Sequence, residues 1–107
     1  VVGTPGGTTI PTSVFQTLVN IIVFGLSPDD AVNKSKFHHQ WMPDELFVEK
    51  DFPVPVTDSL KAMGYTISTR GNIGRTELIK IEKSKTGRGY TFEAVADNRG
   101  DDSAEGY

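Results

Sequence analysis

Cysteine is absent from this chain of 107 residues. Its absence excludes disulfides, thiolate zinc sites and a cysteine nucleophile, but it leaves the compartment open because many exported bacterial proteins also lack cysteine. Long hydrophobic runs are missing too. The longest, residues 21–24, is far too short to span a bilayer, and no signal peptide pattern is visible.

An excess of charge of one sign is also lacking. The chain has 11 basic and 14 acidic residues, for a net charge of −3, and its Lys and Arg residues are scattered. This balance gives no electrostatic case for a nucleic-acid partner. With 36% hydrophobic residues, the chain is long enough for one domain with a real core. We expect a single domain over residues 1–107 with an irregular tail over residues 97–107, and the start without Met inside an expected strand indicates a piece of a longer or processed protein.

The most informative segment is the opening, residues 1–11, in which two β-branched residues run into a Pro-Gly-Gly turn and then a helical pattern. Pro5 fixes φ, while Gly6 and Gly7 can adopt conformations closed to residues with a Cβ. Adjacent bare amides next to a helix N-terminus can hold an anion. The turn therefore suits a phosphate, a carboxylate or the oxyanion of an acyl-transfer intermediate, and the alternative is a plain structural turn.

Helical periodicity covers residues 10–24, with Thr8 or Thr9 as the expected N-cap and Gly25 as the stop. Apolar residues cover most of this helix, so we expect a buried N-terminal helix. One narrow polar stripe interrupts them, and its next position holds the apolar Val23. The stripe consists of Ser13, Gln16, Thr17 and Asn20.

The rest of the chain predicts an α+β fold with mixed or antiparallel strands. Ser27 is expected to cap a short helix ending near residue 34, and Thr57 a second one ending at Met63 after an extended spacer at residues 52–55. Residues 37–46 read as an irregular, partly buried connector. Strands are expected at residues 46–49, 65–69, 77–82 and 90–95, with a hairpin turn at residues 85–89.

Two further groups of residues suggest chemistry. His38 and His39 have Asp44 and Glu45 close by, but neighbours in an extended segment point to opposite sides, so we expect no metal site. No cofactor is expected either. The hydroxyls of Thr12 and Ser13 are candidate nucleophiles, but the sequence places no base beside them, which favours capping or helix-surface roles.

Four separated motifs carry a resemblance to a known family. They are residues 3–7 (GTPGG), 30–33 (DAVN), 37–46 (FHHQWMPDEL) and 97–107 (DNRGDDSAEGY). In this order and spacing, over essentially the whole chain, they resemble the C-terminal half of the small subunit of γ-glutamyltranspeptidases.

The resemblance implies an N-terminal-nucleophile hydrolase with two central β-sheets between helices, an αββα sandwich. In that family a proenzyme cuts itself, and the new N-terminal threonine attacks the γ-glutamyl amide of glutathione. Water or an amino acid then resolves the acyl-enzyme. The family's paired glycines form the oxyanion hole, and those positions here are Gly6 and Gly7.

The resemblance also implies what lies outside this chain. The family's threonine and its glutamyl-binding groups lie upstream of Val1, so the chain alone is expected to be inactive. The implied partners are glutathione or other γ-glutamyl compounds, the large subunit and the remainder of the small subunit, and the implied location is periplasmic or secreted. Arg99-Gly100-Asp101, which matches the cell-adhesion tripeptide, is then interpreted as structural or as a contact to the large subunit.

Two departures and two alternatives remain. The family usually has an acid where this chain has Val23 and a proline where it has Ser35. One alternative is a related acylase or a poly-γ-glutamate-cleaving enzyme with the same half-subunit. The other is an inactive, self-associating piece, such as a strand-exchanged homodimer formed through unpaired sheet edges.

Overall fold

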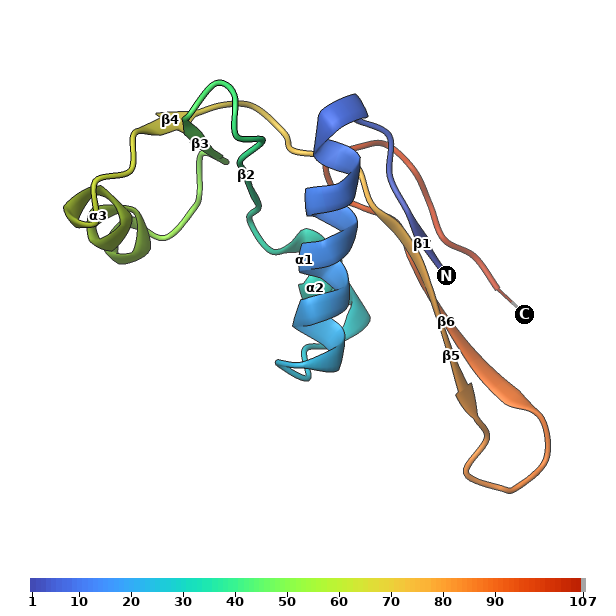
Figure 1. Ribbon diagram of the computed structural model, residues 1–107. Coiled ribbons are helices and arrows are strands. Elements are labelled where there is room, and N and C mark those ends of the chain that lie inside the picture. Colours follow the sequence, from blue (N-terminus) through green and yellow to red (C-terminus); the bar gives the residue numbers. More distant parts are fainter. Residues whose placement is uncertain (107) are drawn as a thin grey trace.

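Helix α1 (Ile10–Ile22) stands between two three-stranded sheets in the computed structural model, which describes residues 1–106 (Figure 1). The sheet on one side has the strand order β1-β5-β6, and the sheet on the other side has the order β2-β3-β4. This arrangement of helices and separate small sheets confirms the expected α+β class. None of the helices in residues 1–106 has the length and apolar character needed to cross a membrane.

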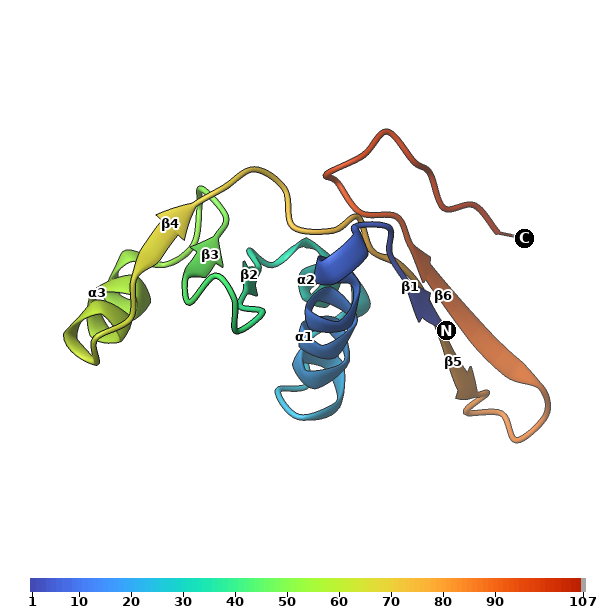
Figure 2. The same cartoon turned by 45° about the horizontal axis from the view of Figure 1, so that its top comes forward.

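The first sheet joins the start of the chain to its end. Strand β1 (Val2–Gly3) pairs antiparallel with β5 (Glu77–Lys83), which pairs antiparallel with β6 (Tyr90–Val95). The hairpin between β5 and β6 is where the sequence predicted it. Leu78 and Val95 face each other across the two strands and form a small core with Val32 of helix α2 (Pro28–Asn33). The tail after β6 turns back along this sheet (Figure 2).

The second sheet is mixed. Strand β2 (Phe37–His38) pairs antiparallel with β3 (Leu46–Val48), and β3 pairs parallel with β4 (Ile67–Thr69). Helix α3 (Val54–Ala62) lies in the connection between β3 and β4. Strand β2 lies inside the segment expected to be irregular. Its two residues pair with β3 in a part of the chain whose large side chains hide any alternation.

Local capping signals gave one correct and one wrong helix start. Ser27 caps α2 as predicted, since its Oγ accepts a hydrogen bond of 3.1 Å from the Asp30 amide. Helix α3 begins earlier than expected, at Val54, so the extended spacer at residues 52–55 was wrong. Proline is tolerated in a first helical turn because the amide it lacks has no partner there. Thr57 lies inside the helix and donates to the Val54 carbonyl at 2.8 Å.

The prediction of a buried N-terminal helix was wrong. The buried residues of α1 are Ser13 and Thr17 of the polar stripe, whereas Phe15 is 63% exposed and Ile22 is 75% exposed. Small hydroxyl side chains let the helix approach the backbone near Gly74 closely, and a Cβ added there would lie 3.1 Å from the Ser13 Cβ. Helix α1 therefore packs against the rest of the described chain mainly along its polar side.

The apolar sides of α1 belong to a larger exposed surface. The chain exposes 7306 Å², whereas a compact protein of its mass exposes about 5,900 Å². Its radius of gyration is 15.7 Å, and its extents are 52 × 26 × 21 Å. The difference in area, about 1,400 Å², is more than the ~800 Å² that one partner contributes to a standard protein interface.

We expect Ser27→Ala to lower the free energy of unfolding by about 1 kcal/mol, because the Asp30 amide loses its acceptor at the start of α2. Chemical denaturation measures the change. Ser103→Ala, at an exposed serine of the tail, is the matched control and should stay within about 0.5 kcal/mol of the parent. Equal losses in both variants would contradict the capping role.

Candidate active site

The predicted anion-binding turn lies between β1 and the short 3₁₀ helix η1 (Gly7–Thr9), which continues into α1. Gly6 has φ 137° and Gly7 has φ 59°, both in the region that favours glycine. A Cβ on Gly6 would also collide with the Thr9 hydroxyl, whereas open space surrounds the Cβ position of Gly7. The conformation therefore requires glycine at position 6 and favours it at position 7.

The amides of this turn are available to a ligand. Within residues 1–106, neither the Gly6 nor the Gly7 amide donates a hydrogen bond to another protein group, and both residues are exposed. The start of α1 differs from the prediction. Thr9 is the N-cap residue but makes no side-chain capping bond, because η1 leads directly into α1 and Thr9 is already helical.

The loop of residues 73–76 backs the turn from the protein side. Gly74 has φ 74°, and a Cβ there would lie 2.7 Å from the Ser13 hydroxyl and 2.8 Å from the Thr4 hydroxyl. The next amide, that of Arg75, donates to the Thr4 Oγ1 at 2.7 Å. The turn, the loop and helix α1 are thus in close contact at one point.

A buried ion cluster holds both ends of this loop. The Glu49 carboxylate accepts a hydrogen bond of 2.7 Å from the Ile73 amide, and the Asp97 carboxylate accepts one of 2.7 Å from the Thr76 amide. Arg99 joins the two acids, with contacts of 2.6 Å to Glu49 and 2.9 Å to Asp97. The Arg99 side chain is 8% exposed, so the adhesion-like tripeptide does not present its arginine at the surface.

Lys36 completes the cluster from the segment before β2. Its amine donates to the Val32 carbonyl at 2.6 Å and lies 3.6 Å from Asp97, while its amide donates to Glu49 at 2.7 Å. Two acids and two bases are therefore buried together with no net charge. The sequence gives no sign of this cluster because its members come from distant positions.

The two histidines point into different surroundings. The His38 ring is 1% exposed and lies 2.8 Å from the Thr12 hydroxyl and 2.9 Å from the Gln40 side chain. His39 instead contacts Asp44 at 3.1 Å. Thr12 thus does have an imidazole beside it, contrary to the expectation, but both nitrogens of that ring have protein partners. In residues 1–106, no three His, Asp or Glu side chains form a group that could hold a metal ion.

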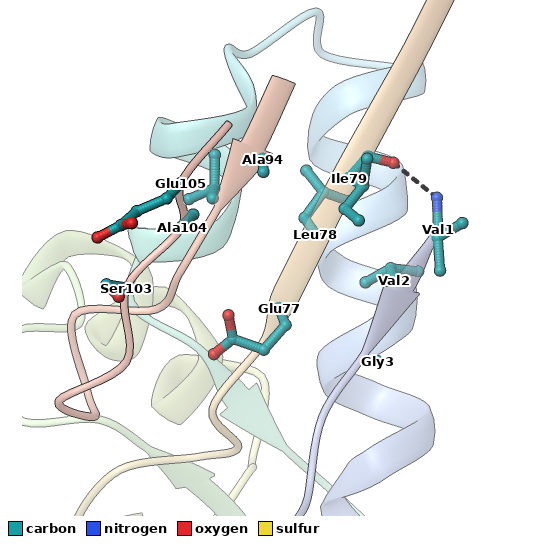
Figure 3. Close-up of a pocket in the computed structure, with 11 residues that line it drawn as sticks. Val1, Val2, Gly3, Glu77, Leu78, Ile79, Ala94, Ser103, Ala104 and Glu105 are labelled. Carbon is teal, nitrogen blue, oxygen red and sulfur yellow. Dashed lines mark hydrogen bonds between the residues drawn. The ribbon is translucent and has the colours of Figure 1, made fainter. Parts of the chain in front are cut away.

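A cleft of about 500 Å³ lies along β1 and the first residues of β5 (Figure 3). The Val1 ammonium group donates to the Ile79 carbonyl at 2.7 Å along one wall. The tail at residues 103–105 forms part of the opposite wall. Its lining is mostly apolar, with two carboxylates, those of Glu77 and Glu105, among the lining residues.

The family follows from a comparison of the whole sequence. A family described as gamma-glutamyltranspeptidase matches residues 1–107. The chain belongs to the gamma-glutamyltranspeptidase family. It is 43% identical over 81 residues to a glutathione hydrolase proenzyme of Escherichia coli, covering 76% of this chain and 14% of that protein. It is 40% identical over 104 residues to one of Pseudomonas aeruginosa, covering 94% and 18%.

Solved structures of the gamma-glutamyltranspeptidase family have the same arrangement. An acivicin-inhibited gamma-glutamyltranspeptidase is 38% identical with a TM-score of 0.87, covering 94% of this chain and 53% of that one. The enzyme from Pseudomonas nitroreducens complexed with L-DON is 36% identical with a TM-score of 0.85, covering 100% and 54%. The chain therefore spans about half the length of these matched chains. A cephalosporin acylase from Bacillus halodurans, at 24% identity and a TM-score of 0.81, shares the fold alone.

Strong hydrogen bonding keeps the acids of the cluster ionised in this family member. Burial raises the pKa of the Glu49 carboxyl, but hydrogen bonds from Arg99 and from the Ile73 and Lys36 amides hold that pKa below its usual range. Burial likewise raises the pKa of Asp97, but hydrogen bonds from the Thr76 amide and from Arg99 outweigh it and hold that pKa below its usual range. Burial and the charge of Arg99 lower the pKa of Lys36, against the opposing effect of the two carboxylates.

These shifts predict that the protein loses stability in acid. Because the folded pKa values of Glu49 and Asp97 are lowered, the unfolded chain binds more protons, and the contribution of both groups falls as the pH drops below about 5. Glu49→Gln should lower the free energy of unfolding at pH 7 by about 3 kcal/mol, because it leaves two buried cations, Arg99 and Lys36, to share the single carboxylate of Asp97. Its stability should then depend less steeply on pH in the acid range.

The control for this variant is Glu82→Gln, which removes an exposed partner of Lys80 at 3.1 Å. It should change stability by less than about 1 kcal/mol. Chemical denaturation between pH 3 and pH 8 measures both variants, and an unchanged acid slope in Glu49→Gln would contradict the assignment.

Proposed function

We propose that this chain is the C-terminal half of the small, catalytic subunit of a γ-glutamyltransferase. The enzyme moves the γ-glutamyl group of glutathione to water or to an amino acid, and the Gly6 and Gly7 amides form its oxyanion hole. The observation that supports this role is the pair of exposed glycine amides that have no protein partner within residues 1–106. The relatives of this chain include glutathione hydrolase proenzymes.

The chemistry requires donors that are fixed before the reaction begins. A threonine outside residues 1–107 attacks the γ-carbonyl carbon, and the carbonyl electrons move onto its oxygen. When the C=O bond re-forms, the C–N bond breaks and the amine of the substrate leaves with the proton of the threonine hydroxyl, which gives the acyl-enzyme. The two amides donate hydrogen bonds to that oxygen as its charge develops, and they stabilise it again when water or an amine attacks the acyl-enzyme. Donors of this kind each contribute roughly a hundredfold or more to turnover.

The remainder of the enzyme accounts for the exposed apolar surface. We infer that the upstream part of the small subunit and the large subunit cover the apolar sides of α1 and the outer face of β5 and β6, completing an αββα sandwich. Ile81 and Phe92 face each other on that outer face and are 48% and 65% exposed. The excess exposed area and the half-length match to solved chains support this arrangement.

In the full-length protein, Gly7→Val should lower kcat about a hundredfold or more and change KM much less. The substituted backbone cannot keep φ at 59°, so at least one amide leaves its position. Steady-state kinetics on a γ-glutamyl anilide measure the change. Gly25→Val is the matched control because Gly25 has φ 66°, open space around its Cβ position and a place at the far end of α1. Unchanged kcat in Gly7→Val would make the turn merely structural.

Residues 1–107 purified alone should not hydrolyse or transfer the γ-glutamyl group, because the threonine lies in the upstream segment of the small subunit. The same assay, repeated after adding that segment together with the large subunit, is the positive control. Saturable turnover by residues 1–107 that survives repurification would overturn this assignment. It would direct attention to Thr12, whose hydroxyl lies 2.8 Å from His38.

A further inference from the structure

The direction of each amide in the glycine turn depends on the carbonyl in the same peptide unit. A peptide unit is planar and trans, so its C=O and N–H point in opposite directions. The Pro5 carbonyl therefore fixes the direction of the Gly6 N–H, and the Gly6 carbonyl fixes that of the Gly7 N–H. Whatever binds these two carbonyls decides where the two proposed oxyanion donors point.

Thr9 binds the second of these carbonyls twice. Its hydroxyl donates to the Gly6 oxygen at 3.0 Å, and its amide donates to the same oxygen at 3.2 Å. Thr9 is 3% exposed, so water does not compete strongly for this pair of bonds. The Gly6–Gly7 peptide plane is held by a buried residue three positions further along the chain.

Thr4 binds the first carbonyl through a relay. Its hydroxyl donates to the Pro5 oxygen at 2.8 Å and accepts the Arg75 amide hydrogen at 2.7 Å. Because the Arg75 amide can only donate, the Thr4 oxygen acts as its acceptor and the Thr4 hydroxyl proton is free to bind the Pro5 carbonyl. The Thr4 hydroxyl therefore ties the Pro5–Gly6 peptide plane to the backbone of the 73–76 loop.

That loop cannot easily yield. Gly74 has no room for a Cβ between the Thr4 and Ser13 hydroxyls. The amides at the two ends of the loop, those of Ile73 and Thr76, are held by buried carboxylates. The anchor point for Thr4 is thus fixed on three sides.

We propose that the Thr4 and Thr9 hydroxyls are positioning groups that hold the two peptide planes of the turn, so that the Gly6 and Gly7 amides stay directed away from the protein. This inference rests on the oxyanion role proposed above. Paired glycines rotate easily, and a flipped peptide would present a carbonyl oxygen to the developing negative charge. The hydroxyls prevent that loss before substrate arrives, which is the preorganisation that transition-state stabilisation needs.

The test uses the full-length enzyme with Thr4→Val and Thr9→Val, which keep the branched shape and remove the hydroxyl. We expect each to lower kcat about tenfold to a hundredfold with KM within about twofold. Thr4→Ser and Thr9→Ser restore the hydroxyl and should return kcat to within about twofold of the parent. Thr8→Val is the matched control, because Thr8 lies in the same turn, is exposed and makes no side-chain hydrogen bond within residues 1–106.

A second readout separates positioning from folding. A boronic acid analogue of the γ-glutamyl group forms a tetrahedral adduct with the nucleophile, so its inhibition constant should rise in parallel with the loss of kcat. Denaturation midpoints of all variants are measured alongside. Valine variants that lose stability but keep kcat and boronate affinity would overturn the inference.

The outcomes also distinguish this inference from the function on which it rests. If Gly7→Val lowers kcat and the threonine variants do not, the oxyanion role stands and the positioning role is wrong. If Gly7→Val has no effect, the proposed function itself fails. Loss of kcat in both valine variants, with rescue by serine, supports both proposals.

Discussion

The bidentate ion pair between Arg99 and Glu49 is the interaction on which the rest of this structure depends. The guanidinium donates through Nε and Nη2 to the two oxygens of one buried carboxylate, at 2.6 Å each. Its remaining groups bind Asp97 and the Val32 and Lys34 carbonyls. One side chain from the tail thereby connects helix α2 to the end of β3 directly, and to the loop before β5 through the two carboxylates.

Such a cluster is held by geometry rather than by a large net gain in energy. Burying four charged groups is costly, and mutual attraction compensates only when the hydrogen bonds are nearly complete. Here each carboxylate accepts from backbone amides as well as from Arg99. Because the cluster holds the Ile73 and Thr76 amides in place, it fixes the loop behind the glycine turn.

Sequence reasoning succeeded where the determining forces are local. The Ser27 cap, the β5–β6 hairpin and the preference for glycine at residues 6 and 7 depend on neighbouring residues alone. It failed for α1, because periodicity reveals that a helix has two kinds of face but not which face the rest of the chain covers. Nothing in the sequence singles out Lys36 and Glu49, since only the fold shows that they share a buried site with the tail. The pairing of Thr12 with His38 was hidden for the same reason, as the two lie 26 positions apart.

The order in which the cluster's members occur along the chain has a consequence for biosynthesis. The glycine turn is among the first segments of these residues to leave the ribosome, but Asp97 and Arg99, which support the loop behind it, are among the last. Until the tail has been synthesised, the 73–76 loop has only part of its anchoring and the turn lacks its rigid backing. A ribosome that stalls before residue 97 therefore leaves the Gly7 amide held by Thr9, but leaves the Gly6 amide without the fixed loop to which Thr4 anchors it.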